Sequence, residues 1–258
     1  MRMRRWTVVL ALVGGWAMNG ASGQGGGAAP AGPAPSAAPA PGKPAPAPVA
    51  AAPAVVGTVR VTGKLKPAAV IKPTQDKVVC GKKPLVDESV LAGAKGVLAN
   101  AVVWLDGVPG GAVTAAKGVV DQAGCRYLPH VQALPVGSSL TLLNSDATLH
   151  NVHGYLGDDT LFNVGMPMKG VKSTQVLEQP GVVTLGCDAG HTWMRAYVVV
   201  FAHRYYAVTG KDGRFSIGGV PAGTYKVKVW HERLGTVSGS VEVKADGSGS
   251  VELALAAK

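Results

Sequence analysis

Short apolar runs separated by Gly, Pro, Asn and Asp recur along the chain from about residue 55 onward. Some runs alternate apolar and polar residues, as in 58–62, where Val59 and Val61 share one face. The run 196–202 is apolar on both faces and indicates a central strand. Helical periodicity is not sustained, so the pattern predicts an all-β fold. We expect strands at 58–62, 99–106, 139–144, 182–185, 196–202, 214–217, 224–230, 240–244 and 250–255, and one short helix at 87–95.

The first 23 residues have the organisation of a signal peptide. Arg2, Arg4 and Arg5 form a basic start, and the apolar run after them is short and interrupted by glycine. Small residues at 21–23 suit a cleavage site, so we expect export to the periplasm or the extracellular space, with Gln24 near the mature start. An uncleaved segment that anchors the chain is the alternative. The sequence has no other long apolar run, which predicts no membrane span after signal removal.

Residues 24–54 consist almost entirely of Ala, Pro and Gly. Such a segment has too few apolar side chains to compensate the entropy of ordering, and we predict a disordered linker that acts as an extended spacer. The remaining portion of about 205 residues is long enough for two small hydrophobic cores.

The formal net charge is +10, and removing the three arginines of the signal peptide leaves +7. The remaining Lys and Arg residues are scattered singly, whereas a nucleic-acid-binding surface would show a basic cluster with aromatic residues between the charges. We therefore expect no nucleic-acid partner. The excess positive charge favours solubility and a weak preference for acidic partners.

Residues 187–194 carry three metal-binding side chain types between two apolar runs. Cys187 offers a thiolate, His191 an imidazole and Met194 a thioether, and His150 lies upstream as a second imidazole. Copper in electron-transfer sites takes two imidazoles and a thiolate in a plane, with a distant axial Met. The pattern predicts a site for one copper ion. Zinc is the alternative metal, but zinc rarely uses a thioether, and a closed structural zinc site would need more Cys.

Three cysteines in an exported chain leave one unpaired. If Cys187 is a metal ligand, Cys80 and Cys125 remain to form a disulfide. Closing a loop of that length would stabilise the fold by roughly 4 kcal/mol in the chain-entropy model.

The middle of the chain, about residues 112–203, resembles the cupredoxin (plastocyanin-like) family. Three motifs carry this resemblance: the strand-like run 135–143, the segment NSDATLHNV at 144–152, and the loop 187–194. The resemblance implies a Greek-key β-sandwich. It also implies that His150, Cys187 and His191 are equatorial ligands and that Met194 is the axial ligand. In addition, it implies that Asn151 supports the site through a hydrogen bond toward the thiolate sulfur.

The loop departs from many members of that family, because His191 follows Cys187 by four residues instead of three. This spacing is similar to the second half of the dinuclear copper loop of cytochrome oxidase. A dinuclear centre would need a second Cys at the position of Val183, so we predict a mononuclear site. His153 would point to the opposite face of its strand from His150, and we expect it near the site or on the surface. We expect His130 to be structural.

The C-terminal part resembles the carboxypeptidase regulatory-like (transthyretin-like) sandwich family, with the matching pattern in 205–232. Residues 204–258 supply too few strands for a sandwich of their own. We interpret 57–66 and 98–107 as the first strands of the same sandwich. We predict that 55–111 and 204–258 form one small sandwich, with the cupredoxin-like module 112–203 inserted in it. Two consecutive modules, the first spanning 55–203, are the alternative. We expect a surface position for His231 and Glu232.

These features predict a one-electron carrier or a copper-binding protein, not an enzyme. The sequence lacks a Gly-x-Ser-x-Gly motif, a phosphate-binding Gly loop and suggestive paired carboxylates. A Cys187–His191 nucleophile pair is disfavoured, because cysteine hydrolases usually draw their His from far along the chain. By family analogy the electron would leave through His191, across a rim formed by 166–167 and Trp193, to a redox partner that the sequence does not identify. A copper-delivery protein without redox turnover, or an adhesion or structural module with a vestigial metal site, are the alternatives.

Overall fold

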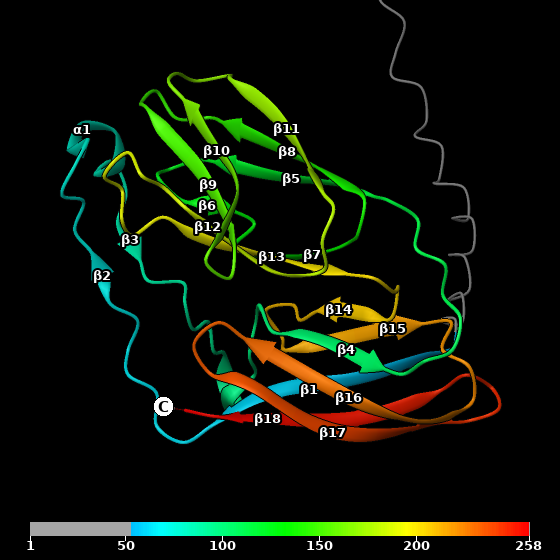
Figure 1. Cartoon of the computed structure of the whole chain (residues 1–258). Coiled ribbons are helices and arrows are strands. Elements are labelled where there is room, and N and C mark those ends of the chain that lie inside the picture. Colours follow the sequence, from blue (N-terminus) through cyan, green and yellow to red (C-terminus); the bar gives the residue numbers. More distant parts are fainter. Residues whose placement is uncertain (1–52, 258) are drawn as a thin grey trace, which may run out of the picture. The chain divides into compact units, whose positions relative to one another are not determined.

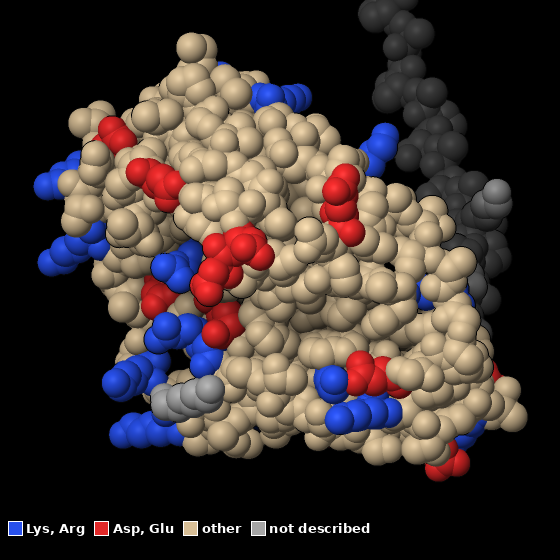
Figure 2. Space-filling model, in the orientation of Figure 1, with Lys and Arg blue, Asp and Glu red and all other residues tan. Residues whose placement is uncertain are grey.

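Two β-sandwiches account for most of the regular structure in the computed structural model, which describes residues 53–257. The all-β prediction is confirmed. The predicted signal peptide and nearly all of the predicted linker lie outside the described residues. Within 53–257 no helix is long and apolar enough to cross a membrane. On the face shown in Figure 2, cationic and acidic side chains are interspersed.

Sandwich 1 joins the start of the described chain to its end (Figure 1). In its first sheet, β1 lies between β15, to which it is antiparallel, and β18, to which it is parallel. Its second sheet has the order β14-β4-β16-β17. The strands are β1 (Ala54–Thr62), β4 (Val102–Asp106), β14 (Tyr206–Val208), β15 (Arg214–Gly218), β16 (Gly223–His231), β17 (Gly235–Val243) and β18 (Gly249–Ala256).

Sandwich 2 is built entirely from the chain between β4 and β14. One of its sheets has the order β10-β9-β12-β13-β7 and the other the order β11-β8-β5-β6. The strands are β5 (Lys117–Gln122), β6 (Tyr127–Leu128), β7 (Val131–Pro135), β8 (Ser138–Asn144), β9 (His150–Leu156), β10 (Asp159–Met166), β11 (Lys172–Leu177), β12 (Gly181–Gly186) and β13 (Arg195–Phe201).

Each sandwich encloses its own apolar core, and β13 shows how the sequence pattern produces this. Val198 and Val200 belong to the core of sandwich 2, with Leu140 and Leu185. Val199, on the opposite face of β13, belongs to a third cluster that includes Val102 of β4. The apolar residues on both faces of this strand are therefore explained, because one face packs inside sandwich 2 and the other against a strand of sandwich 1.

The segment between β1 and β4 forms an arm, defined here as residues 63–101. It contains β2 (Val70–Ile71), α1 (Lys77–Cys80), β3 (Leu85–Val86) and η1 (Ala94–Gly96). Cys80 at the end of α1 forms a disulfide with Cys125, which lies between β5 and β6 of sandwich 2. This covalent bond fixes the middle of the arm to sandwich 2.

The helix expected at 87–95 is wrong. The Asp87 carboxylate accepts a hydrogen bond from the Ser89 N–H (2.8 Å), which is a turn that competes with helix formation. Ala92 forms an isolated antiparallel bridge with Leu98, and Lys95 has the left-handed φ of 59°. The only α-helix of the described residues is α1, in the preceding part of the arm.

Candidate metal centre

The loop after β12 and the start of β9 meet at one end of the five-stranded sheet of sandwich 2. β9 and β12 are antiparallel neighbours, with Gly186 paired to His153. Cys187 directly follows β12, so the register brings it beside the first residues of β9, which begins at His150. The turn between Cys187 and β13 carries His191, whose carbonyl accepts a hydrogen bond from the Met194 N–H (2.8 Å).

Three donor atoms converge at this point. His150 Nδ1 lies 3.2 Å from His191 Nδ1, and Cys187 Sγ lies 3.7 Å from His191 Nδ1. One ligand atom from each of the three residues can be chosen so that all lie within 4.8 Å of one another. Both imidazoles are fully buried, and Cys187 is 7% exposed. Two imidazole nitrogens and one thiol sulfur grouped away from water form a donor set suited to copper.

A carboxylate binds the outer nitrogen of each imidazole. Asp146 Oδ2 lies 3.0 Å from His150 Nε2, and Asp76 Oδ2 lies 2.9 Å from His191 Nε2. Because an ionised carboxylate can only accept a hydrogen bond from the nitrogen it faces, both rings are held with Nε2–H outward and Nδ1 toward Cys187. Sequence reasoning missed both aspartates. Asp146 precedes His150 by four residues within the NSDATLHNV motif and could have been suspected, whereas nothing in the sequence indicates Asp76.

The electrostatics of the three donor groups favour a thiolate beside an imidazolium. Burial alone would lower the pKa of His150, but hydrogen bonds and charges from Asp146 and Cys187 outweigh it and raise the pKa to about 9. Burial alone would raise the pKa of Cys187, but a hydrogen bond from His150 and the backbone N–H groups of Ala189 and Asn151 lower it. Burial and the charge of His150 lower the pKa of His191. The centre therefore stabilises a deprotonated thiol, the form that binds metals.

Met194 is 1% exposed and lies in the same apolar cluster as Cys187. Its role as axial ligand stays a prediction.

The other two residues that the sequence placed near the site lie on the opposite face of β9 from His150. The Asn151 side chain accepts a hydrogen bond from the Asp188 N–H (3.1 Å) and donates one to Asn163. Its side chain therefore links β9 to the Cys187 loop. His153 lies 2.7 Å from the Asp188 carboxylate and stacks on Tyr155.

The expected exit rim is wrong in two respects. Met166 is fully buried, and its sulfur accepts a hydrogen bond from Gln122 Nε2 (2.8 Å). His191 is not a surface ligand, because it is fully buried and its outer nitrogen faces Asp76. Trp193 does lie against His191, with the rings edge-on and their centroids 5.2 Å apart.

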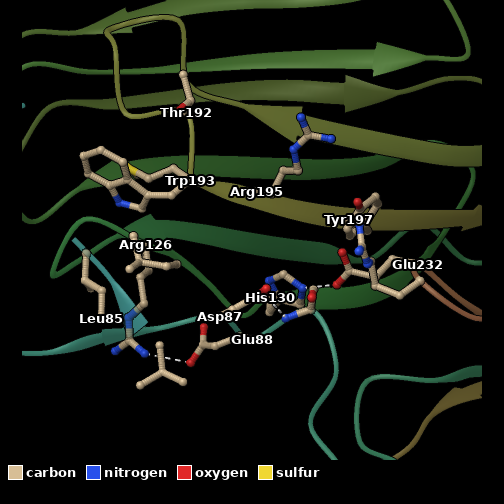
Figure 3. Close-up of a pocket in the computed structure, with 15 residues that line it drawn as sticks. Leu85, Asp87, Glu88, Arg126, His130, Thr192, Trp193, Arg195, Tyr197 and Glu232 are labelled. Atoms are coloured by element: carbon tan, nitrogen blue, oxygen red, sulfur yellow. Dashed lines mark hydrogen bonds and ion pairs between the residues drawn. The ribbon is translucent and has the colours of Figure 1, made fainter. Parts of the chain in front are cut away.

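A pocket of about 580 Å³ opens beside the centre and is lined by residues from the arm and from both sandwiches (Figure 3). Trp193 and Met194 reach it from the site loop, and Arg126 and Glu88 form an ion pair at 2.7 Å on its wall. His130 pairs with Glu232, whose side chain is 5% exposed. The surface position expected for His231 and Glu232 is therefore wrong, because His231 is also buried.

Acidification is expected to destabilise the fold through His231. Burial and the charge of His130 lower its pKa from 6.5 to about 4, although Glu232 acts in the opposite direction. Its Nδ1 accepts a hydrogen bond from the Arg233 N–H (3.3 Å), which only the neutral ring can do. As the pH falls, the His231 ring is therefore protonated in the unfolded chain before it is protonated in the folded protein. About 3 kcal/mol of the free energy of unfolding is lost between pH 6.5 and pH 4.

Urea unfolding across this pH range tests the prediction, with His231→Asn as the comparison. The Asn side chain can still accept the hydrogen bond from the Arg233 N–H, so the variant should fold. Because Asn does not titrate, the variant should lose about 3 kcal/mol less of its free energy of unfolding than the wild type over this pH range. Identical pH dependence in both proteins would contradict the assignment.

Comparisons with known proteins found one domain family and several solved structures that are similar to parts of this chain. A model of the carboxypeptidase regulatory-like domain matches residues 181–256. Similar solved structures include a purple cupredoxin from Nitrosopumilus maritimus, at 26% identity over 33% of this chain and 99% of that chain (TM-score 0.29). They also include a mutant of amicyanin in its reduced state, at 27% identity over 40% of this chain and 99% of that chain (TM-score 0.30). A copper-containing nitrite reductase from Thermus scotoductus SA-01 matches at 18% identity over 38% of this chain and 25% of that chain (TM-score 0.29). No curated protein matches the chain.

Proposed function

We propose that the protein binds one copper ion through His150, Cys187, His191 and Met194 and carries single electrons. The observation that supports this most strongly is the convergence of two Nδ1 atoms and one thiol sulfur in a buried position, with each imidazole fixed from behind by a carboxylate. Bound copper would supply the one-electron couple between Cu(I) and Cu(II).

The protein's own residues would keep the donor geometry nearly constant during electron transfer. Tyr127 is 1% exposed, and its hydroxyl shares its one proton between the Asn151 carbonyl and the Gly186 carbonyl (2.9 Å), which links the start of β9 to the end of β12. Asn151 links β9 to the loop at Asp188. The two histidines and Cys187 thus belong to cross-linked backbone segments, which limits their movement when the charge at the centre changes.

The proposal extends to the organisation and location of the protein. We infer that 55–111 and 204–258 form one carboxypeptidase regulatory-like sandwich with the copper module 112–203 inserted, since β1 and β4 share sheets with β14 to β18. We also infer that the chain is exported by residues 1–23 and acts as a carrier, not as an enzyme.

Copper titration of the purified metal-free protein tests the proposed function. We expect saturation at one copper per chain, an intense visible absorption from thiolate-to-Cu(II) charge transfer, and reversible reduction that removes it. Tight Cu(I) binding without a stable Cu(II) spectrum would point to copper delivery instead. A protein that takes up no stoichiometric copper would overturn the proposal and leave a structural role.

A further inference from the structure

The arm passes directly over the loop that carries His191. The arm's Asp76 places Oδ2 2.9 Å from His191 Nε2, although the two residues are 115 positions apart in the sequence. Gln75 lies against Gly190, where a Cβ atom would come within 2.5 Å of Gln75 Oε1. Two consecutive residues of the arm therefore contact two consecutive residues of the loop.

The arm is held in this place on both sides of the contact. Asp76 adopts the left-handed φ of 46°, and its carbonyl accepts hydrogen bonds from the N–H groups of Val79 and Cys80 (both 2.8 Å) in the turn of α1. Cys80 is then joined to Cys125 by the disulfide. The carboxylate is thus presented to His191 by a backbone turn that is covalently attached to sandwich 2, although the arm's residues belong to neither sheet of that sandwich.

The contact also determines how His191 is buried. The imidazole is fully buried, while the Asp76 side chain that faces it is 40% exposed. The carboxylate therefore lies between the ring and solvent. Asp146 has the corresponding contact with His150 but comes from the same segment of the chain as its histidine.

We propose that Asp76 is a positioning residue for the metal centre, which fixes His191 in the Nε2–H tautomer with Nδ1 toward Cys187, and that residues 75–76 of the arm cover this ligand. The inference rests on the proposed copper function, but the state of His191 can be measured without metal. Outer carboxylates of this kind orient a ligand and make the imidazole a stronger donor, and losing one typically costs 10- to 100-fold in metal affinity.

Asp76→Gly is the variant of choice, because glycine tolerates the left-handed φ and removes the carboxylate. Asp76→Asn also suits this conformation and keeps an acceptor oxygen, so it separates the hydrogen bond from the charge. Asp158→Asn, in the exposed turn between β9 and β10, removes one negative charge from sandwich 2 and serves as the control.

The first measurement is the tautomer of His191 in the metal-free protein, read from nitrogen-detected NMR of the imidazoles at mildly alkaline pH. We expect a single Nε2–H tautomer in the wild type, in Asp76→Asn and in the control, and a mixture in Asp76→Gly. A single Nε2–H tautomer in Asp76→Gly would overturn the positioning role.

The second measurement uses the copper-loaded proteins. In competition with a Cu(I) chelator, we expect Asp76→Gly to bind copper roughly 10- to 100-fold more weakly than the control. We also expect the reduction potential to rise, since a weaker imidazole donor stabilises Cu(II) less. Equal copper affinities and reduction potentials in Asp76→Gly and the control would overturn the inference. If no variant, nor the wild type, bound copper, the proposed function would fail, and the tautomer measurement would still decide the role of Asp76.

Discussion

Cys187→Ser is expected to abolish nearly all of the intense visible absorption of the copper-loaded protein. That absorption arises from charge transfer out of a thiolate, and Cys187 is the only free cysteine among the described residues. Serine keeps the shape of the side chain but offers a poor ligand at neutral pH, since its hydroxyl stays protonated. Replacing outer partners of metal ligands already costs 10- to 100-fold in affinity, so losing the thiolate itself should cost at least about 100-fold.

His153→Gln is the matched control for this experiment. His153 lies close to the site in sequence, but its hydrogen bonds go to Asp188 and Thr160 on the opposite face of β9 from His150. The control should keep one copper per chain and the full absorption. Unfolding of the metal-free proteins by denaturant should confirm that both variants fold. An unchanged spectrum in folded Cys187→Ser would exclude the thiolate as a ligand and with it the proposed centre.

The sequence was most informative where side chain chemistry and strand periodicity coincide. Predicted strands such as 182–185 and 196–202 are central in their sheet and rich in β-branched residues, so their pattern is strong. The strands β10 and β11 were missed. Both are edge strands. The sequence of β11, KSTQVL, is mostly polar and has no apolar alternation to detect, whereas Phe162, Val164 and Met166 of β10 do alternate with less apolar residues and could have been recognised.

In the candidate centre, too, some residues could be predicted from the sequence pattern and others could not. His150, Cys187 and His191 could be proposed from the sequence, because Cys and His at ligand spacing next to β-like runs are uncommon by chance. Asp76 could not be found, because it reaches His191 through the path of the arm, which has only short elements and no periodicity. The burial of His191 was missed for the same reason. A tertiary contact made by an irregular segment leaves no local pattern in the sequence.

Replacing both Cys80 and Cys125 by serine is expected to lower the free energy of unfolding by about 4 kcal/mol. The two residues are 45 positions apart, and the cross-link removes the corresponding loop entropy from the unfolded chain. The measurement is equilibrium unfolding in denaturant of the metal-free protein, because bound copper would add stability by mass action and hide part of the difference. Trp193 offers a fluorescence signal near the change, since its Nε1 donates a hydrogen bond to the Cys125 carbonyl (3.1 Å).

The arm should respond more locally to the same substitution. Without the disulfide, the backbone turn that carries Asp76 is held to sandwich 2 by non-covalent contacts alone, among them those of residues 75–76 and the ion pair of Glu88 with Arg126, and hydrogen exchange in 75–81 should accelerate more than in the central strands. The single variant Cys187→Ser keeps the disulfide and is the control for loss of a cysteine. A stability change below about 1 kcal/mol, with protection of the arm unaltered, would contradict this prediction, because it would mean that non-covalent contacts suffice to hold the arm over His191.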